Sequence, residues 1–408
     1  MFKGAGRNEK SERSKRRRFM NRLSMINRSA GGDYPVVSGA GIAEAELEAL
    51  WHRHLRDPRG SHDSHGSHGS RDSHDPYDRA CIVVDAEVLR LHEDRIRAIQ
   101  MQIGAVEEVF VVPSGESSKS LSMWERGVDY LLRHQVSRRT PVVAVGGGVT
   151  GDLAGFMASA VLRGVPLIHI PTTLLAMADS SIGGKTGVNH ASGKNLIGAF
   201  HTPDAVIQDL DFLKTLPPRE WVNGLSEVLK SGLIADRTLV DDAGEIFTGN
   251  GEPGWEAVAD PDRFQTWLFR CAEIKCEITS DDEFESGRRA FLNFGHTMGH
   301  AMEKMFGYNR LRHGEAVFLG MIGALFLSAK VFGRVAADAL DPFARLYEFD
   351  IRPEELDTSS LISYMALDKK RAGSTVRFVL LEDWEKPTLQ PVDSQLIAEA
   401  VDVIRRSL

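Results

Sequence analysis

The sequence has little cysteine, and its first residues lack the pattern of a secretory signal. Its three cysteines, Cys81, Cys271 and Cys276, are an odd number without the spacing of a metal site. We therefore expect reduced thiols and a cytosolic compartment rather than a disulfide framework. Met1 is followed by polar and basic residues instead of an apolar segment, which argues against secretion.

Long hydrophobic runs are also absent. The longest, residues 316–329, is interrupted by Gly320, Gly323 and Ser328. It is too short to span a bilayer, which takes about 20 residues, so we predict a buried helix. The composition is 42% hydrophobic and 26% charged, as in ordinary soluble proteins. A chain of 408 residues suits two domains better than one core.

Positive charge is concentrated at the N-terminus. Residues 1–28 contain ten lysines and arginines against two glutamates, whereas the whole chain carries a net charge of −8. This cluster could indicate a nucleic-acid or targeting segment, but a disordered tail over residues 1–31 is the simpler interpretation. The acidic remainder argues against nucleic acid as the main partner. Residues 57–78, rich in His, Ser, Gly and Asp, are predicted to be a disordered insert.

Short apolar stretches alternate with helical patterns over residues 32–216, which is typical of a mostly parallel sheet covered by helices. Strands are predicted at residues 34–37, 81–85, 108–113, 141–145, 167–170 and 205–209. Beyond residue 216 the strand signals nearly cease, so residues 217–408 are predicted to form a second, helical domain.

Residues 146–152, GGGVTGD, lie between a predicted strand and a predicted helix. Glycines at such a turn leave backbone amides bare, so a diphosphate can dock at the helix N-terminus. Asp85, at the carboxyl end of another strand, is well placed to accept a ribose hydroxyl. The polar segment 179–195, expected to be a loop, carries Lys185 and Lys194 among glycines, which favours an anionic, phosphorylated ligand.

Residues 289–315, RAFLNFGHTMGHAMEKMFGYNRLRHGE, are the most unusual part of the chain. If this stretch begins as a helix, one stripe of it carries the four polar side chains of Arg289, Asn293, His296 and His300. Each such group would cost roughly 1–3 kcal/mol if buried without a partner. We therefore expect the stripe to face a polar cavity.

Two histidines and one carboxylate can form a catalytic zinc site with an open position. His296 and His300 have the spacing to share a metal, and His313 offers a third imidazole. The carboxylate must come from elsewhere, and Glu227 on a predicted helix is the candidate. Two plainer interpretations stay open: the histidines could be satisfied at the surface, and Glu227 could form only a surface ion pair with Lys230.

Seven motifs follow one another along the chain: GESSKS, GGGVTGDLAGF, PTTLLAMADSSIGGKTGVNHASGKNLIGAF, DLDFLKTLPPRE, GLSEVLKSG, LNFGHTMGHA and HGEAV. In this order they resemble the motifs of the 3-dehydroquinate synthase family, and the resemblance covers residues 34–408. It implies an α/β NAD-binding domain and a C-terminal all-helical metal-binding domain. The implied reaction converts 3-deoxy-D-arabino-heptulosonate 7-phosphate to 3-dehydroquinate and phosphate in the shikimate pathway, with catalytic NAD and zinc or cobalt.

The resemblance also assigns individual residues. It implies three metal ligands, Glu227, His296 and His313, and makes His300 a base on the substrate side rather than a ligand. The implied substrate contacts are Asp179, Lys185, Asn195, Lys230, Lys275, Arg289, Asn293 and, from a lysine pair, Lys370. The implied NAD contacts are Asp85, Glu116, Lys119, Gly148, Val149, Thr150, Gly151, Asp152, Thr172, Thr173, Lys185, Lys194, Phe212 and Thr215. Arg163 matches an arginine that reaches the neighbouring subunit's phosphate site, which implies a homodimer.

Three alternatives differ in what they require. A sibling cyclase such as 2-epi-5-epi-valiolone synthase would act on another sugar phosphate. The resemblance implies that such enzymes carry aspartate and proline at the positions that match Asn293 and His300. A metal-dependent polyol dehydrogenase would share the fold but release NADH. A nucleic-acid binder would lose binding when residues 1–31 are removed. The expected partners are a sugar phosphate and a second copy of the chain, without nucleic acid or membrane.

Overall fold

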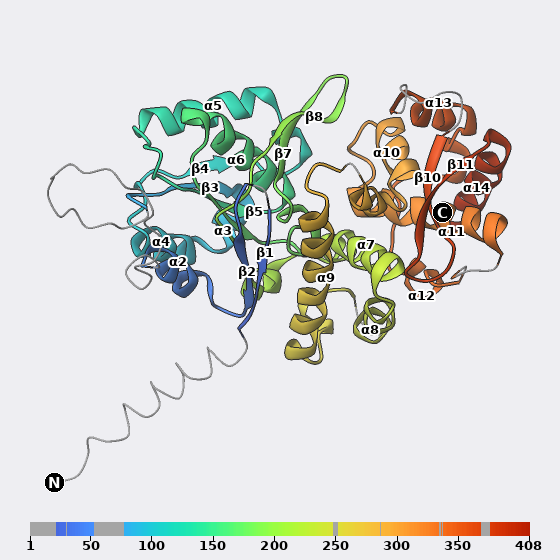
Figure 1. Cartoon of the computed structure of the whole chain (residues 1–408), viewed down its shortest axis with the longest axis horizontal. Helices are drawn as coiled ribbons and strands as arrows, with labels where there is room; N and C mark the ends of the chain where they lie inside the picture. The colour runs from blue at the N-terminus through green and yellow to red at the C-terminus, as the bar shows by residue number, and fades with distance from the viewer. Residues whose placement is uncertain are drawn as a thin grey trace, which may run out of the picture. The chain divides into compact units, whose positions relative to one another are not determined.

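The computed structural model describes residues 22–29, 31–52, 77–247, 252–285, 287–333, 336, 338–368 and 376–408 (Figure 1). These residues divide into two compact units. The sheet unit comprises residues up to 26, 31–172 and 184–211, and the helical unit comprises residues 27–30, 173–183 and 212–408. Each unit is therefore built from segments that are not contiguous in sequence.

A seven-stranded sheet forms the centre of the sheet unit, with the strand order β1-β2-β9-β6-β5-β3-β4. The strands are β1 (Leu23–Asn27), β2 (Tyr34–Gly39), β3 (Cys81–Asp85), β4 (Phe110–Val112), β5 (Val142–Gly146), β6 (Leu167–Pro171) and β9 (Ala205–Asp209). All neighbouring strands from β2 across the sheet to β4, in the order β2-β9-β6-β5-β3-β4, pair in parallel. Almost every residue of β3, β5, β6 and β9 is buried, as expected for parallel strands covered on both faces. The predicted strands and the mostly parallel sheet are confirmed.

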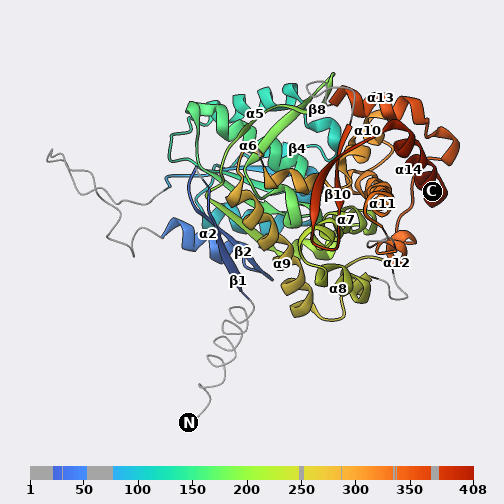
Figure 2. The same ribbon diagram turned by 45° about the vertical axis from the view of Figure 1, so that its right-hand side comes forward.

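Helices cover both faces of this sheet. They are α2 (Ala43–Trp51), α3 (Ala86–Leu91), α4 (Glu93–Gln102), α5 (Leu121–Arg133) and α6 (Gly148–Ala160). Helices α5 and α6 lie on one side of the sheet, with α2 and α4 on the other (Figures 1 and 2). The helix start after β3 is fixed by Asp85, whose carboxylate accepts the backbone N–H groups of Glu87 and Val88.

The predicted disordered tail is wrong for its last residues. Residues 23–27 form β1, one of the two edge strands of this sheet, in which Leu23, Met25 and Asn27 are more buried than the residues between them. This period of two is a strand signal, but it is only five residues long and adjoins a strongly basic segment. Residues 1–21 and 30 lie outside the described residues.

The predicted insert also ends earlier than expected. Tyr77 is buried, its ring centroid lies 4.8 Å from that of Trp51, and its hydroxyl donates a 2.6 Å hydrogen bond to Asp204. The Asp78 carboxylate accepts a hydrogen bond from the Thr140 hydroxyl at 2.8 Å. One aromatic residue among polar ones was too weak a signal to reveal this anchor. Residues 53–76 lie outside the described residues.

Replacing residues 53–76 by a short Gly/Ser linker is expected to leave the fold intact. The Trp51 and Tyr77 rings are only 4.8 Å apart, so a short loop can join them with little cost in closure entropy. The thermal unfolding midpoint should change by less than about 2 °C. Deleting residues 22–29, which removes β1, serves as the contrast and should lower the midpoint clearly. An equal drop in both variants would show that the insert takes part in the fold.

The polar segment predicted as a loop is a β-hairpin instead. Strands β7 (Lys185–His190) and β8 (Gly193–Phe200) pair antiparallel. Gly187 faces Gly198 across this pair, and a Cβ at Gly187 would lie 2.6 Å from the Ile197 carbonyl oxygen. The glycines that suggested a loop are therefore required by close backbone approach, and only a few positions such as Val188 face the core.

The helical unit is built from α7 (Pro218–Ala235), α8 (Thr238–Phe247), α9 (Pro261–Asp281), α10 (His296–Met305), α11 (His313–Phe332), α12 (Asp341–Ala344), α13 (Thr358–Asp368) and α14 (Ser394–Ser407). It also contains an antiparallel pair of strands, β10 (Val376–Leu381) and β11 (Pro387–Val392), visible beside α14 in Figure 1. The predicted helical architecture is confirmed, but "all-helical" is corrected by this pair. The strand-like residues 376–381 are indeed a strand, because Val376 and Phe378 join the core with α11 and α14.

Helix α11 is the predicted buried helix, extended to 20 residues. Within the described residues it alone is long and apolar enough to cross a membrane by length and composition, and 67% of its most apolar window is buried inside the protein. It packs against α7, α10 and α14. This burial is that of the core helix of a globular unit.

Glycines allow α10 and α11 to approach closely. A Cβ at Gly320 would lie 2.0 Å from the Gly295 carbonyl oxygen, and one at Gly299 would lie 3.1 Å from that of Ala316. Gly295 lies directly before the first residue of α10. Its φ of 77° is in the left-handed region, which favours glycine. The first turn of α10 is thereby placed directly against α11.

Gly320→Ala is expected to destabilise the helical unit by about 2 kcal/mol, because the new methyl group must displace backbone rather than a flexible side chain. Gly244→Ala is the matched control: this glycine also lies in a helix, and its Cβ would meet no described residue within 4 Å. The control should be stabilised by about 0.5–1 kcal/mol through loss of glycine's freedom. Urea unfolding of both variants measures the difference, and equal stabilities would contradict the close packing.

Candidate metal centre and its charged surroundings

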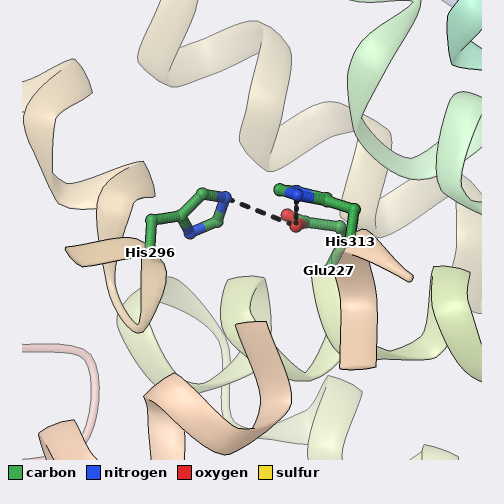
Figure 3. A group of neighbouring side chains, drawn as sticks. All are labelled: Glu227, His296 and His313. Carbon is green, nitrogen blue, oxygen red and sulfur yellow. Dashed lines mark ion pairs between the residues drawn. The ribbon is translucent and has the colours of Figure 1, made fainter. Parts of the chain in front are cut away.

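Three helices of the helical unit each contribute one side chain to a compact group. Glu227 lies on α7, His296 is the first residue of α10, and His313 is the first residue of α11. Figure 3 shows the two imidazoles directed at the glutamate carboxylate. The Glu227 Oε1 atom lies 3.5 Å from His296 Nε2 and 3.3 Å from His313 Nε2.

This group has the properties of a metal site. Among the described residues, the buried Glu227 Oε1 has no well-formed hydrogen bond, and its polar neighbours are the two imidazole nitrogens. A buried oxygen left in this way costs about 1–3 kcal/mol unless something compensates it. One potential ligand atom of each side chain lies within 4.8 Å of the others. Two imidazoles and a carboxylate are the donor set of a three-ligand catalytic zinc site. The residues present therefore fit a divalent cation.

The protonation states of two members suit this role. Burial raises the pKa of Glu227, but the Lys230 ammonium and His296 outweigh it and hold that pKa well below its usual range. Burial also lowers the pKa of His296 well below its usual range, which leaves a neutral imidazole. His296 Nδ1 lies 3.1 Å from the Phe294 carbonyl oxygen. A proton on Nδ1 would leave Nε2 free to bind a metal.

His313 is placed between two carboxylates. Its Nδ1 lies 3.4 Å from Glu303 Oε2, and its Nε2 faces Glu227. Burial lowers the pKa of His313, but Glu303 and Glu227 together outweigh burial and raise it to about 10. A divalent cation at Nε2 would take the place of the proton that faces Glu227.

The predicted continuous stripe from Arg289 to His300 is wrong. Residues Arg288–Asn293 form a 3₁₀ helix, and the left-handed Gly295 separates it from α10. The Arg289 guanidinium donates to the Gly183 carbonyl oxygen at 3.0 Å, and Asn293 Nδ2 donates to Glu285 Oε1 at 2.6 Å. A helical period could not reveal the break, because Gly295 is compatible with a helix in sequence and is placed by packing against α11.

A chain of alternating charges continues from the group. The Lys230 ammonium forms an ion pair with Glu227 and lies 3.5 Å from Asp179 Oδ1, which also lies 2.6 Å from Lys275 Nζ. Burial raises the pKa of Asp179, but the two lysines outweigh it and hold that pKa at about 2. The side chains of Glu227 and Lys230 are both only 1% exposed, so the surface ion pair considered from the sequence is wrong.

Several predicted NAD residues meet in the sheet unit. The Lys119 ammonium contacts both Asp152 and Asn195, and Glu116 lies 3.8 Å from Lys194 Nζ. Sequence reasoning missed Asn189, whose amide donates to Glu116 at 2.7 Å and accepts from the Asn195 backbone at 3.0 Å. Asn189 lies within the polar segment 179–195, and the clustering of polar residues there was the sequence feature that could have indicated it.

The strand-to-helix turn is formed as predicted. Strand β5 ends at Gly146 and α6 begins at Gly148, so the first turn of α6 contains Val149, Thr150 and Gly151. Two hydroxyls at this turn, those of Thr150 and Thr172, are buried and have no hydrogen-bond partner among the residues that the structure describes. Unpartnered buried hydroxyls at a helix N-terminus suit a bound anion.

Other predicted residues lie in less distinctive settings. Lys185 is exposed at the start of β7. Thr173 accepts the Ala176 N–H, and Thr215 donates to the Phe212 carbonyl oxygen. Lys370 lies outside the described residues. Glu303 was not predicted, although it lies seven residues after His296 and therefore on the same face of α10.

Comparison with known proteins decides the family. Residues 109–223 match the model of the 3-dehydroquinate synthase N-terminal region, and residues 224–371 match that of the C-terminal region. The chain belongs to the 3-dehydroquinate synthase family. It is 38% identical to 3-dehydroquinate synthase of Symbiobacterium thermophilum over 91% of this chain and 98% of that protein. It is 40% identical to 3-dehydroquinate synthase of Halalkalibacterium halodurans over 79% of this chain and 88% of that protein.

Solved structures of related cyclases agree with this family. A 2-deoxy-scyllo-inosose synthase complexed with carbaglucose-6-phosphate, NAD⁺ and Co²⁺ is 27% identical, with a TM-score of 0.74 over 95% of this chain and all of that one. ValA, a 2-epi-5-epi-valiolone synthase from Streptomyces hygroscopicus with NAD⁺ and Zn²⁺ bound, is 25% identical, with a TM-score of 0.76 over 94% and 99%. A protein described as a probable glycerol dehydrogenase from Sinorhizobium meliloti, at 17% identity and a TM-score of 0.53, shares the fold alone.

Proposed function

We propose that this protein is a phosphate-eliminating carbon–oxygen lyase that converts 3-deoxy-D-arabino-heptulosonate 7-phosphate to 3-dehydroquinate and phosphate. The observation that carries this proposal is the 38% identity to a 3-dehydroquinate synthase over 98% of that protein. The retained asparagine and histidine at positions 293 and 300 favour it over the sibling cyclases. The step belongs to the shikimate pathway and to aromatic amino-acid biosynthesis.

Glu227, His296 and His313 would hold the divalent metal, zinc or cobalt. When bound, the metal supplies a Lewis acid and a template for substrate hydroxyls. Lys230 keeps Glu227 ionised, and the Phe294 carbonyl and the Glu303 carboxylate orient the two imidazoles. His300 is exposed, with its ring centroid 5.2 Å from that of His296. It is therefore placed to move a substrate proton beside the metal without coordinating it.

Substrate anions would be held by the buried charges next to this site. Lys275 and Lys230 share Asp179, so displacement of that carboxylate frees ammonium groups for the substrate. Arg289 and Asn293 follow in the 3₁₀ helix before α10, and we assign them substrate contacts together with Lys185, Asn195 and Lys370. These assignments follow the family motifs and are proposals for each residue.

Most residues of the proposed NAD site belong to the sheet unit, and Thr173, Phe212 and Thr215 belong to the helical unit. NAD supplies reversible hydride transfer and is regenerated within each turnover. The turn at Gly148, Val149, Thr150 and Gly151 presents backbone amides for the diphosphate, together with the Thr150 hydroxyl, which has no hydrogen-bond partner within the described part of the chain. Asp85 would accept a ribose hydroxyl while it caps α3. The remaining proposed contacts are Glu116, Lys119, Asp152, Thr172, Thr173, Lys185, Lys194, Phe212 and Thr215.

We also propose a cytoplasmic homodimer. Leu162 and Arg163 are exposed and have φ values of 51° and 64°, a left-handed backbone that costs free energy in residues other than glycine. A role for Arg163 at the partner's phosphate site would account for this strain. No nucleic acid or membrane is expected to take part.

One experiment tests the proposed function. The purified full chain is incubated with the heptulosonate phosphate, NAD and Zn²⁺, and the carbocyclic product is identified by NMR while released phosphate is measured. Formation of 3-dehydroquinate with one phosphate per product, at substoichiometric NAD, is the expected result. Accumulation of NADH without a carbocycle would instead identify a polyol dehydrogenase.

A further inference from the structure

His313 is the least enclosed member of the candidate metal centre. Its side chain is 33% exposed, compared with 11% for His296 and 1% for Glu227. General packing therefore cannot hold its imidazole in place as it holds the other two side chains. Specific contacts must do so, and they can be traced at both ends of the residue.

The backbone next to His313 is held by α7. The Gly314 N–H donates to Asn223 Oδ1 at 2.6 Å, and the Gly314 carbonyl accepts from Ser226 Oγ at 2.7 Å. The peptide approaches α7 so closely that a Cβ on Gly314 would lie 2.0 Å from the Asn223 carbonyl oxygen. Asn223 and Ser226 precede Glu227 on α7. The helix that supplies the carboxylate thus also holds the peptide beside His313.

The imidazole of His313 is held by α10. Glu303 is 1% exposed, and its Oε2 lies 3.4 Å from His313 Nδ1. The same helix begins with His296. A carboxylate at the nitrogen opposite the metal-binding one fixes the tautomer and orientation of a ligand histidine and raises its basicity.

We propose that Glu303, Asn223 and Ser226 are positioning residues, which hold His313 to the two helices that carry the other ligands and thereby set the affinity for the metal. These contacts keep the His313 imidazole at a fixed distance from the other two ligands, although its side chain is partly exposed. The inference rests on the proposed metal centre. The nearest rival is a second metal site, because His300, Glu303 and His313 also have ligand atoms within 4.8 Å of one another.

The test compares Glu303→Gln, Glu303→Ala and Ser226→Ala with the wild-type full chain. Metal affinity is measured by competition with a chromophoric chelator for Zn²⁺. We expect Glu303→Ala to weaken binding about 10- to 100-fold and Glu303→Gln to weaken it less, because a neutral amide oxygen can still accept from Nδ1–H. Ser226→Ala should weaken binding about threefold to tenfold. Glu399→Gln, which removes only an exposed ion pair with Lys330, is the matched control.

Two further readouts separate positioning from a general loss of structure. The visible absorption of the Co²⁺-loaded protein should shift in the Glu303 variants, while the thermal midpoint of the metal-free variants stays near that of the control. Unchanged affinity and spectrum in Glu303→Ala would overturn the inference, as would a second equivalent of tightly bound metal that disappears with Glu303. His296→Ala tests the underlying centre separately, because metal retained by that variant would refute the proposed site itself.

Discussion

Replacing Glu227, His296 or His313 by alanine is expected to lower the affinity for Zn²⁺ at least about a thousandfold, or roughly 4 kcal/mol. Each side chain supplies one of three ligand atoms within 4.8 Å of one another, and loss of one leaves two, too few for a stable catalytic zinc site. Glu227→Ala should be the most damaging, because it also leaves the Lys230 ammonium buried without its closest carboxylate.

His300→Ala provides the contrast. The ring centroid of His300 lies 5.2 Å from that of His296, but this residue is exposed and does not belong to the group of Glu227, His296 and His313. The His300→Ala variant should therefore retain its metal but lose turnover. Elemental analysis of each variant after dialysis against a chelator measures occupancy. Full zinc in His313→Ala would reject the assignment of this ligand.

The second large effect concerns substrate choice. We expect kcat/KM for the heptulosonate phosphate to exceed that for sedoheptulose 7-phosphate at least about a hundredfold, or roughly 2.7 kcal/mol. The favoured substrate carries a carboxylate that can use the cations of this site, Lys275, Lys230 and Arg289, whereas sedoheptulose 7-phosphate has none. Phosphate release on the two sugars measures the ratio. Comparable rates would reject the dehydroquinate assignment and leave the cyclase fold standing.

Asn293→Asp should narrow that ratio by harming the favoured substrate. The aspartate would add a negative charge near the substrate carboxylate, at a cost on the order of a few kcal/mol in a partly buried site. It would also face Glu285, which accepts a 2.6 Å hydrogen bond from the Asn293 amide. Asn293→Ala removes the same hydrogen bond without adding charge, so a similar ratio in both variants would show that repulsion is not the cause.

Helical and strand periods predicted most elements because burial imposes them locally. Strands β3, β5, β6 and β9 are apolar runs, since both faces of a parallel sheet are covered. The same reasoning failed for β7 and β8. There, Gly187 and Gly198 are needed by a backbone contact between strands, and the sequence alone does not distinguish that need from a loop.

The candidate metal centre shows the same division. The sequence by itself supplied the candidate donors, the imidazoles of His296 and His313 and the carboxylate of Glu227, and a family resemblance that implies a base rather than a ligand at His300. Only the tertiary structure decided what holds them. Glu303 contacts the His313 imidazole, and Asn223 and Ser226 hold the backbone of the adjacent Gly314. These contacts depend on how α7, α10 and α11 pack, which no local period encodes.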